Sequence, residues 1–204
     1  MKTKLVNFLV IVLIPIIGLS QTEESFEFIS PFSDEVAAVK KGTQWAFIDK
    51  DGAIVVDFRD DLVISESNDL SYPVFINDRC LIQIKKDGIK YFGYIDKSGK
   101  TIIEPKFLNA QNFKNNKAIV LELVKKNVGK NNLLDKNIVY YKYFEVVIDT
   151  EGKVLCYLNE KGTNVVLDKE FLRNPPVFSS KIMSDNLVAL LNENKEWVVR
   201  RIIE

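Results

Sequence analysis

One five-residue signature, Ile-Asp, any two residues, then Gly, constrains the fold more than any other feature of these 204 residues. It stands at "FIDKDG" (47–52), "YIDKSG" (94–99) and "VIDTEG" (147–152), at spacings of 47 and then 53 residues. Internal similarity at such periods is typical of repeat proteins, in which each copy forms one supersecondary unit and neighbouring copies stack. We therefore expect an array of similar units.

The similarity extends beyond the signature and defines four copies. Three copies open on Phe and a hydrophilic stretch before an apolar run: "FSDEVAAVKKG" (32–42), "FINDRCLIQIKKDG" (75–88) and "FKNNKAIVLELVKK" (113–126). A fourth, incomplete copy, "FSSKIMSDNLVALLNENKEWVVRRI" (178–202), follows, with Trp197 aligned on Trp45 and Phe92. The predicted repeats span residues 32–57, 75–107, 113–157 and 178–202.

The residues of each copy favour strands over helices. Short runs of Val, Ile, Phe and Tyr, bounded by Gly, Asn and Asp, are typical of antiparallel meanders. In Asp-x-x-Gly the Asp side chain accepts hydrogen bonds from later backbone N–H groups, and the Gly takes a left-handed conformation. "KKG" (40–42) and "KKDG" (85–88) supply a second turn. The predicted fold class is all-β, an array of antiparallel three-stranded meanders.

Alternation in the second copy gives apolar residues to both faces of its sheet. Phe92 and Tyr94 lie on one face, and Tyr91 and Ile95 lie on the other. A small meander cannot bury two faces alone, so we expect the copies to stack as a short solenoid or an open propeller-like array. The sequence leaves the choice between these closures open. We expect a long hairpin loop at 124–137 and an irregular connection at 57–73.

The N-terminal segment has the pattern of a cleaved signal peptide. Lys2 and Lys4 precede an apolar run over residues 5–19, and Ser20 is a small residue at the expected cleavage site. We predict a signal-peptide helix over residues 1–20 and a single β-repeat domain over 21–204. This predicts export to the periplasm, cell surface or medium, with no stable membrane insertion after cleavage. A retained membrane anchor is the alternative.

Composition excludes several function classes. The expected mature chain has 26 basic and 28 acidic residues after Lys2 and Lys4 are removed, a net charge of −2. This balance gives no long-range attraction to nucleic acid. The chain has no histidine, which removes the usual general base near neutral pH and the commonest transition-metal ligand.

The repeated aspartates are the first candidates for chemistry. Because Asp49, Asp96 and Asp149 occupy equivalent turns, a capping role explains them better than catalysis does. "DKDG" (49–52) resembles the start of a calcium loop but lacks the further acidic ligands at the needed spacing. We therefore predict no catalytic, cofactor-binding or metal-binding residues. A pair of carboxylates for glycoside hydrolysis stays open, since no two of the 28 acidic residues stand out.

Three other groups have a structural and a functional interpretation. Cys80 and Cys156 fit two buried free thiols slightly better than a disulfide. The aromatics Trp45, Phe92 and Trp197 fit a repeated core position better than an exposed ladder that stacks on sugars. The lysine-rich turns are most simply solvated loop tips that protect strand edges.

The second copy, "FGYIDKSGKTIIEPKF" (92–107), resembles the consensus of the WG-repeat family, including its closing Glu104-Pro105. The Trp-Gly pair is replaced by Trp45-Ala46, Glu145-Val146 and Trp197-Val198 in the other copies, and Arg200-Arg201 replaces Ile-Asp in the fourth. The resemblance implies an all-β repeat protein of a type commonly exported by bacteria, without established catalytic residues.

Two functions follow from these observations. We expect an exported non-catalytic β-repeat protein that presents a surface to a protein or a cell-envelope polysaccharide. The alternative is a carboxylate-dependent hydrolase that acts on cell-wall or extracellular carbohydrate.

Overall fold

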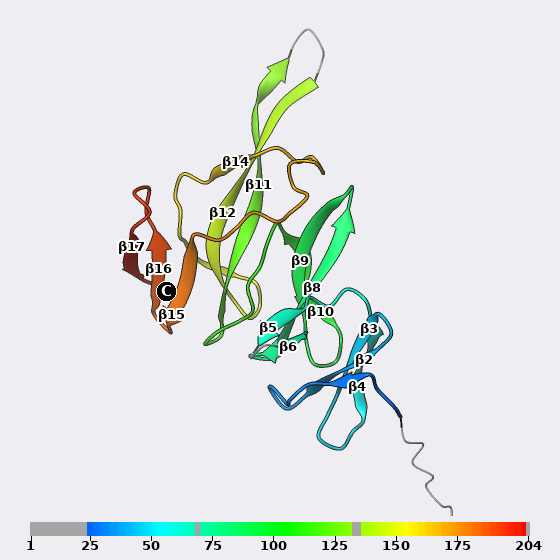
Figure 1. Cartoon of the computed structure of the whole chain (residues 1–204). Helices are drawn as coiled ribbons and strands as arrows, with labels where there is room; N and C mark the ends of the chain where they lie inside the picture. The colour runs from blue at the N-terminus through cyan, green and yellow to red at the C-terminus, as the bar shows by residue number, and fades with distance from the viewer. Residues whose placement is uncertain (1–23, 68–69, 132–135, 203–204) are drawn as a thin grey trace, which may run out of the picture.

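A computed structural model describes residues 24–67, 70–131 and 136–202, and among these residues it contains strands, turns and loops but no helix. Four main antiparallel sheets follow one another along the chain (Figure 1). The predicted fold class, an all-β array of antiparallel meanders, is confirmed. The predicted signal-peptide helix at 1–20 lies outside the described residues.

Each sheet is built from consecutive strands. The first sheet contains β1 (Phe28–Ile29), β2 (Ala37–Lys41), β3 (Gln44–Ile48) and β4 (Ile54–Arg59). The second contains β7 (Phe75–Ile76), β8 (Arg79–Lys86), β9 (Ile89–Ile95) and β10 (Thr101–Phe107). The third contains β11 (Lys117–Asn131), β12 (Lys136–Asp149), β13 (Val154–Tyr157) and β14 (Thr163–Val165). The fourth contains β15 (Ser180–Ser184), β16 (Leu187–Leu191) and β17 (Trp197–Arg201).

The hydrophilic stretch after each opening Phe forms a tight turn with two left-handed residues. The pairs are Asp34-Glu35, Asn77-Asp78 and Asn115-Asn116, all with φ between 53° and 73°. Asp and Asn tolerate this conformation better than most residues, and two-residue hairpin turns require it at both central positions. These short polar residues therefore start the meander of the first three repeats.

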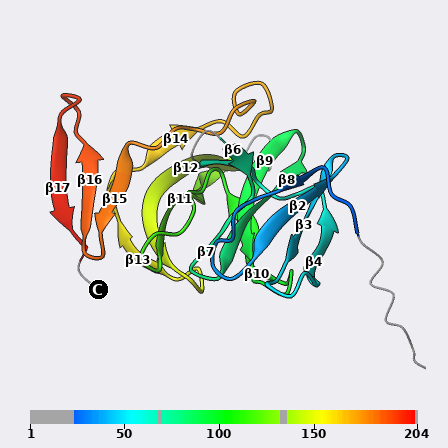
Figure 2. The ribbon, with the colours of Figure 1, turned by 60° about the horizontal axis from the view of Figure 1, so that its bottom comes forward.

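The sheets stack face to face (Figure 2), and the inner sheets bury apolar side chains on both sides. On β8, Ile82 packs toward the first sheet and the adjacent Leu81 packs toward the third. On β11, Val120 packs toward the second sheet and Ile119 toward the fourth. The row is open, because the first and fourth sheets lie at its opposite ends (Figure 2).

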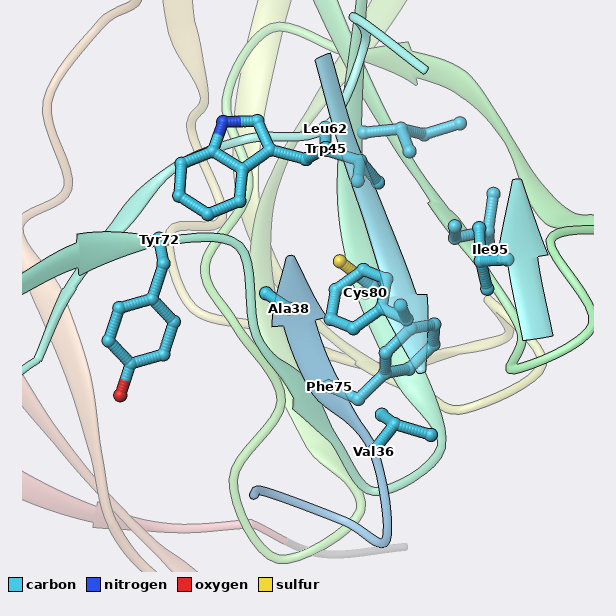
Figure 3. Packing of buried hydrophobic residues seen from close by; sticks show 11 residues of the cluster. Val36, Ala38, Trp45, Leu62, Tyr72, Phe75, Cys80 and Ile95 are labelled. Carbon is cyan, nitrogen blue, oxygen red and sulfur yellow. The ribbon is translucent and has the colours of Figure 1, made fainter. Parts of the chain in front are cut away.

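The cluster between the first two sheets shows how this burial is achieved (Figure 3). Phe47 from β3 and Phe75 from β7 meet edge to face, with ring centroids 4.6 Å apart. Cys80 is fully buried between them and Ala38 of β2. Such aromatic contacts add about 1 kcal/mol to the free energy gained from burial alone.

Polar contacts also join successive repeats. The Asp34 side chain accepts a hydrogen bond from the Asp78 backbone N–H, and the Asn77 side chain accepts one from the Asn116 N–H. At the end of β4, Arg59 donates to the Gly99 carbonyl of the next repeat at 3.0 Å. The first two bonds run between equivalent turns and the third joins a strand end to a turn, so together they fix how each repeat is placed on the next.

The fourth repeat departs from the sequence prediction. Trp197 begins the third strand of its meander, β17, so its alignment on Trp45 and Phe92 was wrong. Val188 on the central strand β16 occupies the position of Trp45. The turn between β16 and β17 is built by Asn192 and by Lys195 with φ of 62°, in place of Asp and Gly. The absence of the signature from this turn shifted the predicted register.

Two connections are also more regular than expected. Most of the predicted loop at 124–137 is strand, because β11 and β12 pair as far as Asn131 and Lys136; residues 132–135 lie outside the described part. The predicted irregular connection at 57–73 contains a small hairpin of β5 (Ser65–Ser67) and β6 (Leu70–Tyr72).

The glycine of the Trp-Gly pair allows β10 to approach β9 closely. Opposite Gly93 the strand β10 bulges, so that three residues, 104–106, face it between the paired residues Ile103 and Phe107. A Cβ at position 93 would lie 2.3 Å from the Ile103 carbonyl oxygen and 2.7 Å from the Pro105 nitrogen. Only glycine fits this position without a backbone shift.

In the first and third repeats the bulge is shorter, and glycine is not required at this position. Two residues, 57 and 58, face Ala46 in the first repeat. In the third repeat Val146 pairs directly with Tyr157 and faces no extra residue at that point. Across the first three repeats the side chain at this position grows as the opposing bulge shrinks, which explains the loss of glycine from the Trp-Gly pair in the first and third.

We predict that Gly93→Ala lowers the free energy of unfolding by about 1–3 kcal/mol, because the added methyl group collides with backbone that cannot swing away. Urea denaturation of the expressed chain measures this loss. Lys100→Ala is the control, since Lys100 is exposed and its change is expected to stay within about 0.5 kcal/mol. Equal stability of Gly93→Ala and the parent would mean that the two strands are not so close.

Candidate functional site

The three signature aspartates are turn caps in the structure. The Oδ1 atom of Asp49, Asp96 and Asp149 accepts backbone N–H groups two and four residues later, at 2.9–3.1 Å. The glycines at 52, 99 and 152 close these turns with φ of 79° to 81°. Each carboxylate is used within its own turn, as the sequence predicted.

Asp96 has the strongest set of contacts among the three. Burial by itself would raise the pKa of Asp96, but hydrogen bonds from the Ser98 hydroxyl and from the Ser98 and Lys100 N–H groups outweigh it. The pKa of Asp96 is therefore held below its ordinary value. The carboxylate is stabilised in its charged form, which suits a cap and opposes a role as proton donor.

The aromatic positions separate into a buried and an exposed group. Trp45 and Phe92 are only 6% and 5% exposed, so the predicted core role is confirmed for them. Trp197 is 54% exposed. The three side chains do not form a common row, and an exposed ladder of these aromatics is excluded.

Trp197 belongs to an apolar surface that none of the described sheets covers. We call it the terminal face: the outward side of β15–β17, opposite the side that packs on the third sheet. Its most exposed apolar members are Met183 (49%), Trp197 and Val199 (66%). The Lys181 ammonium lies 4.5 Å from the centroid of the Trp197 ring. The terminal face comprises Lys181, Met183, Leu187, Ala189, Leu191, Trp197, Val199 and Arg201.

The opposite end of the stack is covered. On the outer side of the first sheet, Val39 and Ala46 are fully buried beneath Phe26 and Phe58. The Lys41 ammonium sits over both rings, 5.2 Å and 5.3 Å from their centroids. Solenoids need such a polar cap on a terminal repeat to stay soluble. The described part of the fourth sheet lacks an equivalent cover.

A concave region of about 610 Å³ lies between the third and fourth sheets. Glu145 lines it and is itself buried. Its carboxylate accepts hydrogen bonds from the Ser179 N–H and hydroxyl, both at 2.7 Å, and from the Ser180 hydroxyl. These bonds fasten the start of β15 to β12, so both carboxylate oxygens have a structural use.

Glu145 was not singled out by sequence reasoning. It occupies the position of Trp45 and Phe92, where the sequence showed only a decayed signature. The available signal was an acidic residue at an expected core position, because such a group is buried only with hydrogen-bond partners. Those partners, Ser179 and Ser180, come from the next repeat and were not identifiable from spacing.

The two cysteines are free thiols in the structure, as the sequence slightly favoured. Cys80 packs in the cluster between the first and second sheets, and Cys156 packs against the cluster between the third and fourth. Burial raises the pKa of both thiols. They lie too far apart in the stack to be joined, and neither has the character of an activated nucleophile.

The described residues were also searched for a metal site and for a membrane-spanning helix. No group of three or more Cys, Asp or Glu side chains there is arranged to hold a metal ion. A search of the same residues finds no helix long and apolar enough to span a membrane.

Comparison with known families agrees with the repeat geometry. Residues 25–44 and 92–122 match the model of the family described as WG containing repeat. Over these two segments the chain is similar to the WG repeat. The WG repeat is a repeat module and not a known enzyme family. The second matched segment includes Gly93 and the turn of Asp96, whose roles in the WG repeat the structure now explains. No curated protein and no solved structure gave a match.

We predict that Asp96→Ala lowers the free energy of unfolding by about 1 kcal/mol at neutral pH, a value discounted because the site is solvent-exposed. Since the pKa of Asp96 is lower in the folded state, its contribution exists above the unfolded-state pKa and disappears as pH falls through the folded-state pKa. In chemical denaturation, the difference in free energy of unfolding between the parent and Asp96→Ala should be smaller at about pH 3 than at pH 7.

The matched control for this experiment is Asp51→Ala. Asp51 occupies the middle of the equivalent first turn, and its exposed side chain makes no hydrogen bond within the described structure. We expect little change at either pH. A constant loss for Asp96→Ala across the same pH range would contradict the capping role of its charge.

We predict that the folded protein has the same mass before and after reduction, because the two thiols are free. Iodoacetamide should label the partly exposed Cys156 faster than the buried Cys80, and denaturation should equalise the two rates. Mass spectrometry of tryptic peptides measures both. An unreduced chain lighter by two hydrogen atoms would contradict the structure.

Proposed function

We propose that this chain is an exported, non-catalytic WG-repeat protein that binds a partner protein through the terminal face. The exposed Trp197, Met183 and Val199 carry this proposal. Every other main sheet face in the described stack is buried against a neighbouring sheet or a local cap. A contiguous apolar face without such cover is characteristic of an interaction site.

The composition of the terminal face favours a protein partner. Trp and Met are enriched at protein interfaces. Trp offers a large contact area with few rotatable bonds, and the flexible Met side chain adapts its packing to the partner. Lys181 and Arg201 stand on the same face beside the apolar residues, and neither makes an ion pair in the described structure. The complementary partner surface is apolar with carboxylates at its border.

Export is part of the same proposal. Its support is the N-terminal pattern of Lys2, Lys4 and the apolar run at 5–19, residues that lie outside the described structure. An exported chain with an uncovered apolar sheet would meet its partner in the cell envelope or outside the cell. The mass of the secreted form checks this step, with Gln21 expected as its first residue.

The carboxylate hydrolase is the second candidate, and the cavity beside Glu145 is the specific observation in its favour. Against it, Glu145 is held by three hydrogen bonds from serine residues, and Glu160 and Glu193 at the cavity rim are exposed. Incubation with envelope polysaccharides, followed by an assay for new reducing ends, separates the candidates. Turnover that Glu145→Gln abolishes would overturn the non-catalytic proposal.

We predict that a photo-crosslinking amino acid at position 183 captures a protein of the cell envelope, whereas the same group at position 29 does not. Ile29 is a matched control, because it is 55% exposed but lies on the first sheet. With the captured protein purified, Trp197→Ala should weaken binding at least tenfold, as expected for a central aromatic residue. Calorimetry measures the affinity.

Charge substitutions on the terminal face give a second test of binding to the partner. Lys181→Glu should weaken binding to the same protein, and an acidic-to-basic substitution on the partner should restore it. Unchanged affinity of Trp197→Ala would contradict the terminal face as the site. Crosslinks solely to a second copy of this chain, or retention by a polysaccharide alone, would also overturn the proposed protein partner.

A further inference from the structure

A second surface, which shares no residue with the terminal face, gathers positive charge. The tip of the β8–β9 hairpin and the segment 168–173 enclose an open pocket of about 400 Å³. Four cationic side chains line it against a single carboxylate, that of Glu170. The cations are Lys85, Lys90, Lys169 and Arg173. We call this the basic pocket.

The cations of the basic pocket repel one another. Lys85 and Lys90 are directly opposite on β8 and β9, and like charges in such a cross-strand pair are destabilising. Lys169 and Arg173 add two more charges to the same pocket. Within the described part of the chain, none of the four makes an ion pair or a side-chain hydrogen bond. The fold therefore leaves this repulsion uncompensated.

The equivalent hairpin of the first repeat is neutralised. There, Lys41 pairs with Glu24 at 2.5 Å, and Lys40 lies opposite Trp45 with its ammonium 5.7 Å from the ring centroid. In the second repeat Gln83 and Phe92 occupy the positions of Lys40 and Trp45, and the longer hairpin continues beyond them to the pair of Lys85 and Lys90. The charge of the basic pocket is thus a property of this repeat and does not follow from the shared hairpin design.

The two basic segments are fixed against each other by buried contacts. Ile89, beside Lys90, and Leu172, between Lys169 and Arg173, are both buried in one cluster. At Gly88, where φ is 84°, an added Cβ would lie 2.8 Å from the Cβ of Lys169. The turn of Asp168 is closed by its own carboxylate, which accepts the Glu170 N–H at 2.8 Å. The backbone positions that carry the four exposed cations are therefore set before any ligand arrives.

We propose that the basic pocket binds a phosphate monoester group. Its dianion supplies the charge that the pocket lacks, and its three terminal oxygens can accept several donors at once. The guanidinium of Arg173 suits two oxygens in parallel, while the lysines act as point charges around the group. The pocket volume leaves room for the sugar or headgroup that carries the phosphate. This inference is independent of the proposed function of the terminal face.

The first test is thermal unfolding of the folded chain with inorganic phosphate, against sodium chloride at the same ionic strength. Chloride screens the repulsion between lysines equally well. Phosphate also raises the Tm by exclusion from the protein surface, an effect that does not saturate, so a bound anion is recognised by an additional rise that saturates with phosphate concentration. We expect such a rise with phosphate. Equal melting temperatures in the two salts at every concentration, or a difference that does not saturate, would overturn the proposal.

Charge-neutral variants locate the site. Lys85→Gln and Arg173→Gln should each weaken phosphate binding about tenfold, the usual effect of losing one charged hydrogen-bond donor. Lys85→Gln should also raise the Tm without phosphate, because it removes one member of the repelling pair. If the hairpin tip were only a solvated loop, Lys85→Gln would raise the Tm without phosphate but would not weaken phosphate binding. Lys153→Gln, an exposed lysine at the β12–β13 turn, is the control and should change neither.

The source of the phosphate is decided with two probes. Glucose 6-phosphate in calorimetry represents a soluble phosphorylated ligand, and vesicles of phosphatidylcholine with phosphatidate represent a lipid headgroup. Binding of either probe that is weakened by Arg173→Gln supports the phosphate site and identifies its source. Binding that is unaffected by both Lys85→Gln and Arg173→Gln, or absent for all three probes, would overturn it.

Discussion

The structure depends on the burial of apolar side chains on both faces of each inner sheet. Leu81 and Ile82 are neighbours on one strand, yet one packs toward the third sheet and the other toward the first. Each such side chain contributes about 2 kcal/mol when buried, and a separate meander would expose half of them. One repeat therefore cannot fold by itself, and the stack is the smallest stable arrangement.

This constraint also determines where the molecule is free to interact. The inner faces pack against neighbouring sheets. The turn aspartates cap their own turns, and Glu145 holds the start of β15 to β12. What remains are the ends of the stack and the tips of its hairpins. The first sheet closes its end with Phe26, Phe58 and Lys41, whereas the fourth exposes Trp197. The tip of β8–β9 carries the uncompensated lysines.

Much of the fold was predictable because its turns have strict local requirements. The left-handed conformation favours Gly, Asn and Asp, so Gly52, Gly99 and Gly152 marked three hairpins in the sequence. The fourth hairpin was missed because Lys195 adopts the same conformation, φ 62°, without that signature. Long-range contacts were less accessible: the hydrogen bonds between Glu145 and Ser179, and the approach of Lys169 to Gly88, join residues with no fixed spacing.

The sequence by itself determined the repeat, its three signature turns and the apolar character of both sheet faces, because these depend on neighbours within a few residues. Only the tertiary structure decided which repeated positions are covered. Trp45 is buried because a second sheet packs on the first, and Trp197 is exposed because no described sheet packs on the outward side of the fourth. Likewise, Lys85 and Lys90 form a charged pocket only once segment 168–173, 80 residues away in the chain, docks beside them. Burial and charge density are properties of what surrounds a residue, and those surroundings come from distant parts of the chain.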